Sequence, residues 1–348
     1  MLRETLARMS CNESPEGKSA YLEGVQKGYD LSLALISVNS HHEMTLRFLD
    51  IIAAIPGITA VSSYEVFVRS PQKNESDVAQ PLLFRRFPIS LEEGYRDANS
   101  DIIEKLFLKY NAPFVTCSYD DKNYIFMRTE ECIPSRVLLA EGKASATDLA
   151  LLSGLHQIFT RQTVLLDDKE RDALTHLLNR QSLGHTLAEV KRYYLTKKAT
   201  KDSEKLSWLA LMDIDHFKKI NDKYGHLFGD EVLLHFSNLL EENMRYTDFI
   251  FRYGGEEFVV ILNDTTAEGA KECFERFRIA VENFAFPSGG VTVSIGYTPI
   301  IPDKPSEQLI AEADKSVYYA KDNGRNQVIS ADQLASDGHF SADDVELF

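Results

Sequence analysis

Two apolar runs joined by two glycines and two glutamates form the stretch Asp248-Phe249-Ile250-Phe251-Arg252-Tyr253-Gly254-Gly255-Glu256-Glu257-Phe258-Val259-Val260-Ile261-Leu262. Aromatic and β-branched residues on both sides of a glycine pair predict a β-hairpin. Gly254 and Gly255 can adopt the positive φ angles that a tight turn needs. The carboxylates of Glu256 and Glu257 would then lie at the turn, where a cation could reach them. The alternative is an acidic turn that is simply solvated.

A second acidic motif ends the apolar run Trp208-Leu209-Ala210-Leu211-Met212-Asp213-Ile214-Asp215. The run predicts a core strand, and carboxylates at the end of such a strand project into a cleft. If this strand pairs beside the hairpin, Asp213 and Glu256 converge and can hold Mg²⁺, a hard cation that takes oxygen ligands. Asp215 is interpreted as a structural acid and is left out of the site.

Five blocks in the C-terminal half match one known family in order. The hairpin block, Gly254-Gly255-Glu256-Glu257-Phe258, resembles the signature of the GGDEF family of diguanylate cyclases in its GGEEF form. A single short match would be a weak signal, but five collinear matches are a strong one. The other four are Asp172-Ala173-Leu174-Thr175-His176-Leu177-Leu178-Asn179-Arg180, Asp213-Ile214-Asp215-His216-Phe217-Lys218-Lys219-Ile220-Asn221-Asp222, Gly225-His226-Leu227-Phe228-Gly229-Asp230 and Ala320-Lys321-Asp322-Asn323-Gly324-Arg325-Asn326.

The resemblance implies a nucleotidyl transfer in which two GTP molecules condense into cyclic di-GMP and two pyrophosphates are released. A ribose 3′-hydroxyl attacks the α-phosphate of the other GTP, and Mg²⁺ neutralises charge on the attacking and leaving oxygens. The family's metal ligands match Asp213, Glu256 and the backbone carbonyl of Ile214, with Mn²⁺ as the alternative ion. Glu257 either assists metal binding or helps to deprotonate the hydroxyl.

The resemblance also implies which residues bind the substrate. Asn221 and Asp230 match the family's guanine-contacting positions, and they supply the amide and the carboxylate that guanine's edge requires. Taken alone, Asn-Asp would indicate a turn. The phosphate-binding residues match Lys321 and Arg325, and the backbone N–H groups of Phe217 and Lys218 lie at a helix start that suits an anion.

A product-binding site is implied by Arg245-Tyr246-Thr247-Asp248, which matches the family's RxxD inhibitory motif. Arg276 is a second candidate contact for the product. Without the family, Arg245 and Asp248 would be read as a surface ion pair. One departure is visible, because His176 stands where the family usually has glycine.

Composition limits the other classes of function. The 348 residues are enough for two domains, and the formal charge of −15 argues against a broad nucleic-acid or anionic-lipid surface. The four cysteines form no Cys-x-x-Cys pair, so zinc and a disulfide framework are disfavoured. The sequence shows no signal peptide or membrane span, which predicts a cytoplasmic protein without membrane insertion.

The N-terminal part, residues 1–147, predicts an α+β sensory module. Helices are expected at 41–55 and 102–110, and strands at 58–68, 82–87 and 124–127. The module is loosely similar to GAF-like domains, and the alternative is a domain used only for dimerisation.

A helical linker is predicted at 148–171. Leu151, Leu155, Ile158, Gln162 and Leu165 have the spacing of a short parallel coiled coil, which would suit an enzyme that needs two copies. Packing of the helix on its own domain would produce the same pattern.

The C-terminal domain, 172–330, is expected to be α/β (α+β) with the order βααββαβ, an antiparallel-containing sheet with helices on one side. This order resembles the palm of nucleotide cyclases and polymerases. Residues 331–348 are expected to be a solvated acidic tail. The predicted function is a homodimeric diguanylate cyclase regulated by its N-terminal domain and by product. The alternatives are an inactive cyclic di-GMP receptor and a dimerisation scaffold.

Overall fold

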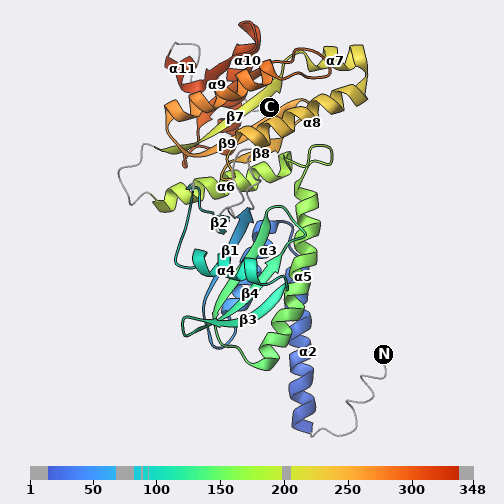
Figure 1. Cartoon of the computed structure of the whole chain (residues 1–348), viewed down its shortest axis with the longest axis vertical. Helices are drawn as coiled ribbons and strands as arrows, with labels where there is room; N and C mark the ends of the chain where they lie inside the picture. The colour runs from blue at the N-terminus through green and yellow to red at the C-terminus, as the bar shows by residue number, and fades with distance from the viewer. Residues whose placement is uncertain (1–14, 68–81, 88, 93, 198–204, 337–348) are drawn as a thin grey trace. The chain divides into compact units, whose positions relative to one another are not determined.

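The computed structural model describes residues 15–67, 82–87, 89–92, 94–197 and 205–336 (Figure 1). The chain divides into two compact units. The first comprises Met1–Glu65 and Asn99–Asp167, and the second comprises Val66–Ala98 and Asp168–Phe348. The predicted N-terminal domain is therefore interrupted, because residues 66–98 count with the C-terminal unit.

The first unit is built on a five-stranded sheet with the order β2-β1-β5-β4-β3. The edge strand β2 belongs to the segment that counts with the second unit. Strands β3, β4 and β5 pair antiparallel in sequence order. The elements are α2 (Pro15–Ile36), α3 (His41–Ala53), β1 (Ile58–Phe67), β2 (Leu83–Phe87), α4 (Ser100–Lys109), β3 (Phe114–Tyr119), β4 (Lys122–Thr129), β5 (Ser135–Gly142) and α5 (Ala146–Glu170).

The α+β class and the predicted helices and strands of this unit are confirmed, while β3 and β5 were missed. Ser40 begins α3 by accepting a hydrogen bond from the Glu43 N–H at 3.2 Å, and the helix ends shortly before Pro56. The missed strand β3 is short and no residue in it is fully buried, although Val115, Cys117 and Tyr119 do alternate with the exposed Thr116 and Ser118.

Helix α5 packs into the core of its own unit. Leu152, Leu155, Phe159 and Leu166 are buried there, and the ring of Phe159 stacks on that of Phe48. The buried set includes Leu155, one of the positions of the predicted coiled-coil seam. Intramolecular packing therefore accounts for much of the apolar pattern in this helix.

His156 is an ionisable residue inside this aromatic core. Its ring lies 6.3 Å from those of Phe48 and Phe159, and its Nε2 is buried without a hydrogen-bond partner among the described residues. Burial lowers the pKa of His156 to about 4. The unfolded chain then binds a proton more readily than the folded chain once the pH falls below the ordinary value of about 6.5.

Acid should therefore destabilise the first unit through His156. Between about pH 6.5 and pH 4 this residue is expected to remove up to about 3 kcal/mol of folding free energy. In His156→Phe the difference in melting temperature between pH 7 and pH 5, measured by calorimetry, should shrink. His185→Gln, which changes an exposed histidine, should leave that difference unchanged; an undiminished difference in His156→Phe would contradict the prediction.

The second unit is built on a six-stranded sheet with the order β11-β10-β7-β9-β8-β6. The predicted hairpin is the antiparallel pair β8 and β9, and β7 lies on the other side of β9. The elements are β6 (Leu178–Asn179), α6 (Arg180–Lys197), β7 (Leu206–Ile214), α7 (Phe217–Tyr224), α8 (His226–Asn243), β8 (Phe249–Arg252), β9 (Glu257–Thr265), α9 (Ala267–Asn283), β10 (Val293–Pro299), α10 (Ser306–Asp322), β11 (Val328–Ser330) and α11 (Ala331–Ser336).

Helices cover both faces of this sheet, so the prediction of helices on one side is wrong. One apolar cluster joins the sheet to α8 and α9, and a second joins its other face to α6 and α10. The reason lies in β7 and β9, which are buried at nearly every position and so carry apolar side chains on both faces. The α/β class itself is confirmed.

Segment 66–98 contributes a core residue to the second unit. Leu91 is fully buried in the same cluster as Leu183 and Leu187 of α6. Nearby, the Gly94 N–H donates to the Tyr246 hydroxyl at 2.7 Å, and the Tyr193 hydroxyl donates to the Glu92 carboxylate. Polar contacts therefore fix the position of Leu91 on the unit.

The chain after β11 differs from the predicted tail. Residues 331–336 form helix α11, with Ala331 and Leu334 buried, because their spacing places both on one helical face. Residues 337–348 lie outside the described part of the chain. Among the described helices, none combines the length and hydrophobicity needed to cross a membrane.

Candidate active site

The two acidic motifs meet at adjacent strand ends. Asp213 on β7 lies opposite Glu257 on β9, and the Ile214 N–H donates to the Glu256 carbonyl at 3.3 Å. Asp213 and Glu256 line one cavity of about 300 Å³. The cavity is lined by Asp213, His216, Lys218, Lys219, Asp222, Glu256, Lys321 and Arg325.

The carboxylates of this site disfavour one another's charge. Burial raises the pKa of Asp213, and the charges of Asp215 and Asp314 raise it further. Burial followed by the charge of Asp213 raises the pKa of Glu256, and the same two causes raise the pKa of Glu257. A divalent cation between Asp213 and Glu256 would relieve this repulsion.

The oxygen donors suit a hard cation. Two carboxylates and a carbonyl are too few to enclose an ion, and the described residues contain no group of three or more His, Cys, Asp or Glu side chains that could do so. This is the donor set that Mg²⁺ uses when phosphates and water complete its shell. In the structure the Lys321 ammonium donates to Asp213 Oδ2 at 2.6 Å, which balances part of the negative charge.

The double glycine serves a purpose other than the predicted one. Neither Gly254 nor Gly255 has a positive φ, whereas other described glycines such as Gly225 do. A Cβ at Gly254 would instead overlap the Glu257 carboxylate, which folds back over the turn. Gly254 therefore lets the second glutamate lie against the turn, and a Cβ there would make the Glu257 carboxylate move.

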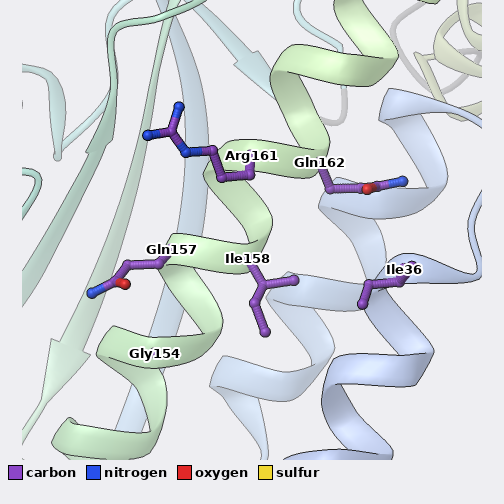
Figure 2. Close-up of a pocket in the computed structure, with 6 residues that line it drawn as sticks. All are labelled: Ile36, Gly154, Gln157, Ile158, Arg161 and Gln162. Atoms are coloured by element: carbon purple, nitrogen blue, oxygen red, sulfur yellow. The ribbon is translucent and has the colours of Figure 1, made fainter. Parts of the chain in front are cut away.

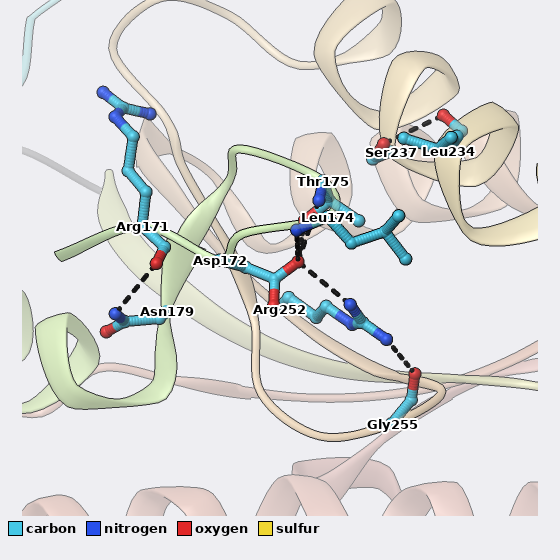
Figure 3. Close-up of polar contacts among 9 residues, drawn as sticks. All are labelled: Arg171, Asp172, Leu174, Thr175, Asn179, Leu234, Ser237, Arg252 and Gly255. Atoms are coloured by element: carbon cyan, nitrogen blue, oxygen red, sulfur yellow. Dashed lines mark hydrogen bonds and ion pairs between the residues drawn. The ribbon is translucent and has the colours of Figure 1, made fainter. Parts of the chain in front are cut away.

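Arg252 joins this turn to the first motif block. Its guanidinium donates to Asp172 Oδ1 at 2.9 Å and to the Gly255 carbonyl at 3.0 Å, as Figure 3 shows. The same Asp172 oxygen accepts hydrogen bonds from the Thr175 N–H and hydroxyl. Burial raises the pKa of Asp172, but these bonds from Thr175 and Arg252 hold it below its usual value. Nothing in the sequence indicates that Arg252 and Asp172 form this contact.

Asn221 carries an unused buried acceptor. It lies on α7, and its Oδ1 has no hydrogen-bond partner among the described residues. A Cβ at Gly229 on α8 would overlap that oxygen, so the glycine leaves room for it. Asp230, next along α8, is half-buried. An orphaned buried acceptor is costly, and donors on a ligand would satisfy it.

Asp215 is structural, as predicted. Its carboxylate accepts hydrogen bonds from the Thr292 and Ser294 hydroxyls, each at 2.7 Å, and from the Asn326 N–H at 3.0 Å. The last bond holds the chain beside Arg325, whose φ of 65° is left-handed. Asp215 therefore fixes the backbone that presents Arg325 to the cavity.

Helix α7 begins at Phe217 beside the cavity. The Phe217 side chain is buried in the core of the unit, so only its backbone is in a position to meet a ligand. Lys218 lines the cavity directly. His216, Lys219 and Asp222 also line it and were not predicted, although all three lie inside a motif block of the sequence.

The predicted inhibitory motif forms a turn before β8. Asp248 is buried, and its carboxylate accepts hydrogen bonds from the Arg245 N–H at 2.8 Å and the Asn263 N–H at 2.9 Å. Arg276 donates to the Asn243 carbonyl at 3.1 Å. Burial raises the pKa of Cys273, and the charges of Arg276, Asp248 and Arg245 all act on its thiol. Arg276 also donates to the Cys273 Sγ at 3.4 Å.

Comparison with known proteins agrees with these motifs. The family model described as "Diguanylate cyclase, GGDEF domain" matches residues 169–327. Diguanylate cyclase A of Treponema denticola is 38% identical over 182 residues, which cover 51% of this chain and 48% of that protein. The response regulator PleD of Caulobacter vibrioides is 42% identical over 165 residues, covering 45% of this chain and 35% of PleD. The chain thus spans about half or less of these curated relatives.

A solved structure is also similar to this chain. It contains the coiled coil and GGDEF domain of DgcB from Caulobacter crescentus in complex with c-di-GMP. The sequence identity is 26% and the TM-score is 0.46, with 53% of this chain and 96% of that chain covered.

Proposed function

We propose, from the premise that residues 169–327 are a GGDEF domain, that the chain is a diguanylate cyclase that converts two GTP molecules into cyclic di-GMP and two pyrophosphates. The observation that carries the proposal is the cavity in which Asp213 and Glu256 lie beside Lys321 and Arg325. Carboxylates next to cations in one pocket suit a metal-bound triphosphate.

Residues in and beside the cavity divide the work of this proposal. Asp213, Glu256 and the Ile214 carbonyl would hold Mg²⁺ or Mn²⁺. When bound, the ion would neutralise charge on the reacting phosphate and on the leaving pyrophosphate. Lys321 and Arg325 would neutralise the remaining phosphate oxygens. The new bond joins the 3′-oxygen of one GTP to the α-phosphorus of the other, and the bond from that phosphorus to the pyrophosphate breaks. Glu257 would either assist metal binding or accept the hydroxyl proton.

Base selection follows from the orphaned acceptor. The Asn221 Oδ1 would accept from guanine's N–H edge, and the Asp230 carboxylate would accept a second such bond. Adenine lacks this arrangement of donors, so the unpaired Asn221 oxygen would stay unsatisfied with ATP. The backbone N–H groups of Phe217 and Lys218 would bind phosphate at the start of α7.

The proposal includes a homodimer, since one domain binds one GTP. The test is to incubate the purified protein with GTP and Mg²⁺ and to identify the nucleotides by chromatography and mass spectrometry. Cyclic di-GMP and pyrophosphate in a 1:2 ratio are expected. A dimeric preparation that forms no cyclic dinucleotide would overturn the enzymatic assignment.

Arg252→Lys should slow the reaction without weakening substrate binding. Lysine keeps the charge but cannot donate to Asp172 and to the Gly255 carbonyl in the same forked geometry. A loosened turn misplaces Glu256 and Glu257, so kcat should fall roughly ten- to a hundredfold while KM for GTP changes little. Arg192→Lys, on the exposed side of α6, is the matched control. A change confined to KM would refute this positioning role.

Arg245→Ala should relieve inhibition by product while leaving the initial rate unchanged. The guanidinium would bind the dinucleotide, whereas the buried Asp248 also holds two backbone N–H groups and is a poorer residue to change. Progress curves with added cyclic di-GMP measure the effect. An inhibition curve that matches the wild type would remove Arg245 from the inhibitory site.

A further inference from the structure

Helix α2 presents a row of exposed apolar side chains, which we call the α2 stripe. Its members are 47% to 65% exposed, although large apolar residues are normally buried. Leu22, Tyr29 and Ile36 are seven residues apart, which is the repeat of a left-handed coiled coil. Val25 has the heptad position between the first two, and Leu33 lies one residue beyond the corresponding position between the last two. The stripe consists of Leu22, Val25, Tyr29, Leu33 and Ile36.

The helix that carries the stripe is attached to its unit by one end. Leu35, near the C-terminal end of α2, is fully buried in the core of the first unit. Residues 22–30 are exposed at every position except Gly28, and Figure 1 shows this part of α2 extending past the sheet. Short helices are marginal in water without packing. The exposed part of α2 therefore needs a partner.

A groove on the first unit continues the stripe. It has a volume of about 360 Å³ and lies between Ile36 of α2 and the face of α5 around Gly154. Figure 2 shows Ile158 and Gln162 on the side of α5 where Ile36 lies, whereas Gln157 and Arg161 point to the opposite side. Leu165, one turn beyond, is 62% exposed. Ile36 is the last residue of the α2 stripe, and Ile158 and Leu165 of α5 continue the apolar surface beyond it.

We propose that the α2 stripe is a homodimer interface, in which two copies of α2 pair as a parallel coiled coil and the α5 groove receives the partner at its C-terminal end. A second copy fits because the stripe carries no charge, and the flanking Glu23, Lys27 and Asp30 have both signs. A lipid surface is disfavoured by those acids and by the net charge of −15. Pairing of identical stripes gives a closed two-fold contact.

The choice of a parallel pair rests on the proposed cyclase, whose two half-sites must meet at the same end of the dimer. The interface differs from the one predicted on residues 148–171. Leu155 of that seam is buried in its own core, and Leu151 packs partly against that core beside Gly28 of α2. Leu165 is exposed, and Ile158 and Gln162 are half-buried, so these three are the seam residues that a partner could reach. The stripe spans about 21 Å at 1.5 Å per residue, so α5 adds area that two short helices alone would lack.

Disulfide trapping distinguishes the possible arrangements. Leu22→Cys and Ile36→Cys are each placed in a full-length chain whose Cys11, Cys117 and Cys273 are serine, and mild oxidation follows. In a parallel pair each variant should crosslink to its own copy, and Lys27→Cys, outside the stripe, should crosslink at least about tenfold less. An antiparallel pair would crosslink only mixtures of the Leu22→Cys and Ile36→Cys chains. Equal crosslinking at Lys27 would overturn the interface.

A second variant separates this inference from the proposed activity. Val25→Glu with Tyr29→Glu removes no buried side chain, so the fold should persist. Sedimentation should show a monomer at concentrations where the wild type is a dimer, with cyclic di-GMP synthesis reduced at least about tenfold. A dimeric double variant would refute the interface even if the wild type is active. A wild-type dimer that traps as expected but makes no product would refute the activity alone.

Discussion

Cyclic di-GMP synthesis falls by about three orders of magnitude or more in Glu256→Gln, while the folded protein remains at least as stable as the wild type. Glutamine keeps the size of the side chain but removes the charge that would hold the cation with Asp213. The pKa of Glu256 is raised by burial and then by Asp213, so the loss of its charge relieves repulsion in the metal-free protein. Activity and stability should therefore change in opposite directions.

Initial rates with GTP and Mg²⁺ measure the first effect, and melting temperature without metal measures the second. Glu242→Gln, at an exposed position on α8, is the matched control and should change neither. Raised Mg²⁺ concentrations should not restore the full rate, because the lost ligand is part of the site. Synthesis at the wild-type rate in Glu256→Gln would exclude Glu256 as a metal ligand.

Gly229→Ala should weaken GTP binding by roughly ten- to a hundredfold, since a Cβ there would displace the amide of Asn221. The new methyl would also lie 3.2 Å from the Phe217 ring, which is too close for the present packing. Alanine is a better helix former than glycine, so the isolated effect on α8 should be stabilising by about 1 kcal/mol. A loss of affinity could then not be ascribed to unfolding.

Isothermal titration with a non-hydrolysable GTP analogue measures this effect. Asn221→Ala should cause a similar loss, and the double variant should add little to either single change, because both remove the same contact. Gly184→Ala, where a Cβ on α6 meets no atom within 4 Å, serves as the control. Additive losses in the double variant would show that Gly229 and Asn221 act separately.

The catalytic half of the fold could be predicted because its signals are local. The run from Trp208 to Ile214 indicates a buried strand, and the hairpin around Gly254 brings Glu256 to its end. The near-continuous apolar sequence of β7 favours a strand that is covered on both faces, as the structure shows. The prediction of helices on one face of the sheet does not take this into account. The positions of Asp213 and Glu256 in one cavity therefore follow from strand pairing and from the family motifs.

Other features depend on contacts between residues far apart in sequence. Nothing near Arg252 indicates that its guanidinium meets Asp172, 80 positions earlier. The close approach at Gly254 comes from the conformation of the Glu257 side chain, whereas a glycine pair alone suggests a positive φ. The apolar spacing of α5 is compatible with a coiled coil and with a core helix, and only the packed structure shows that Leu155 is buried.

The burial of Leu91 in the second unit affects where the catalytic part of the chain can be cut. A fragment starting at Asp168 would keep every motif block, yet it would leave an empty apolar slot beside Leu183 and Leu187. Such a fragment would expose apolar surface to water, so we expect it to aggregate or to be less stable. A fragment that keeps the fold of the second unit therefore needs Leu91 as well as the motif blocks.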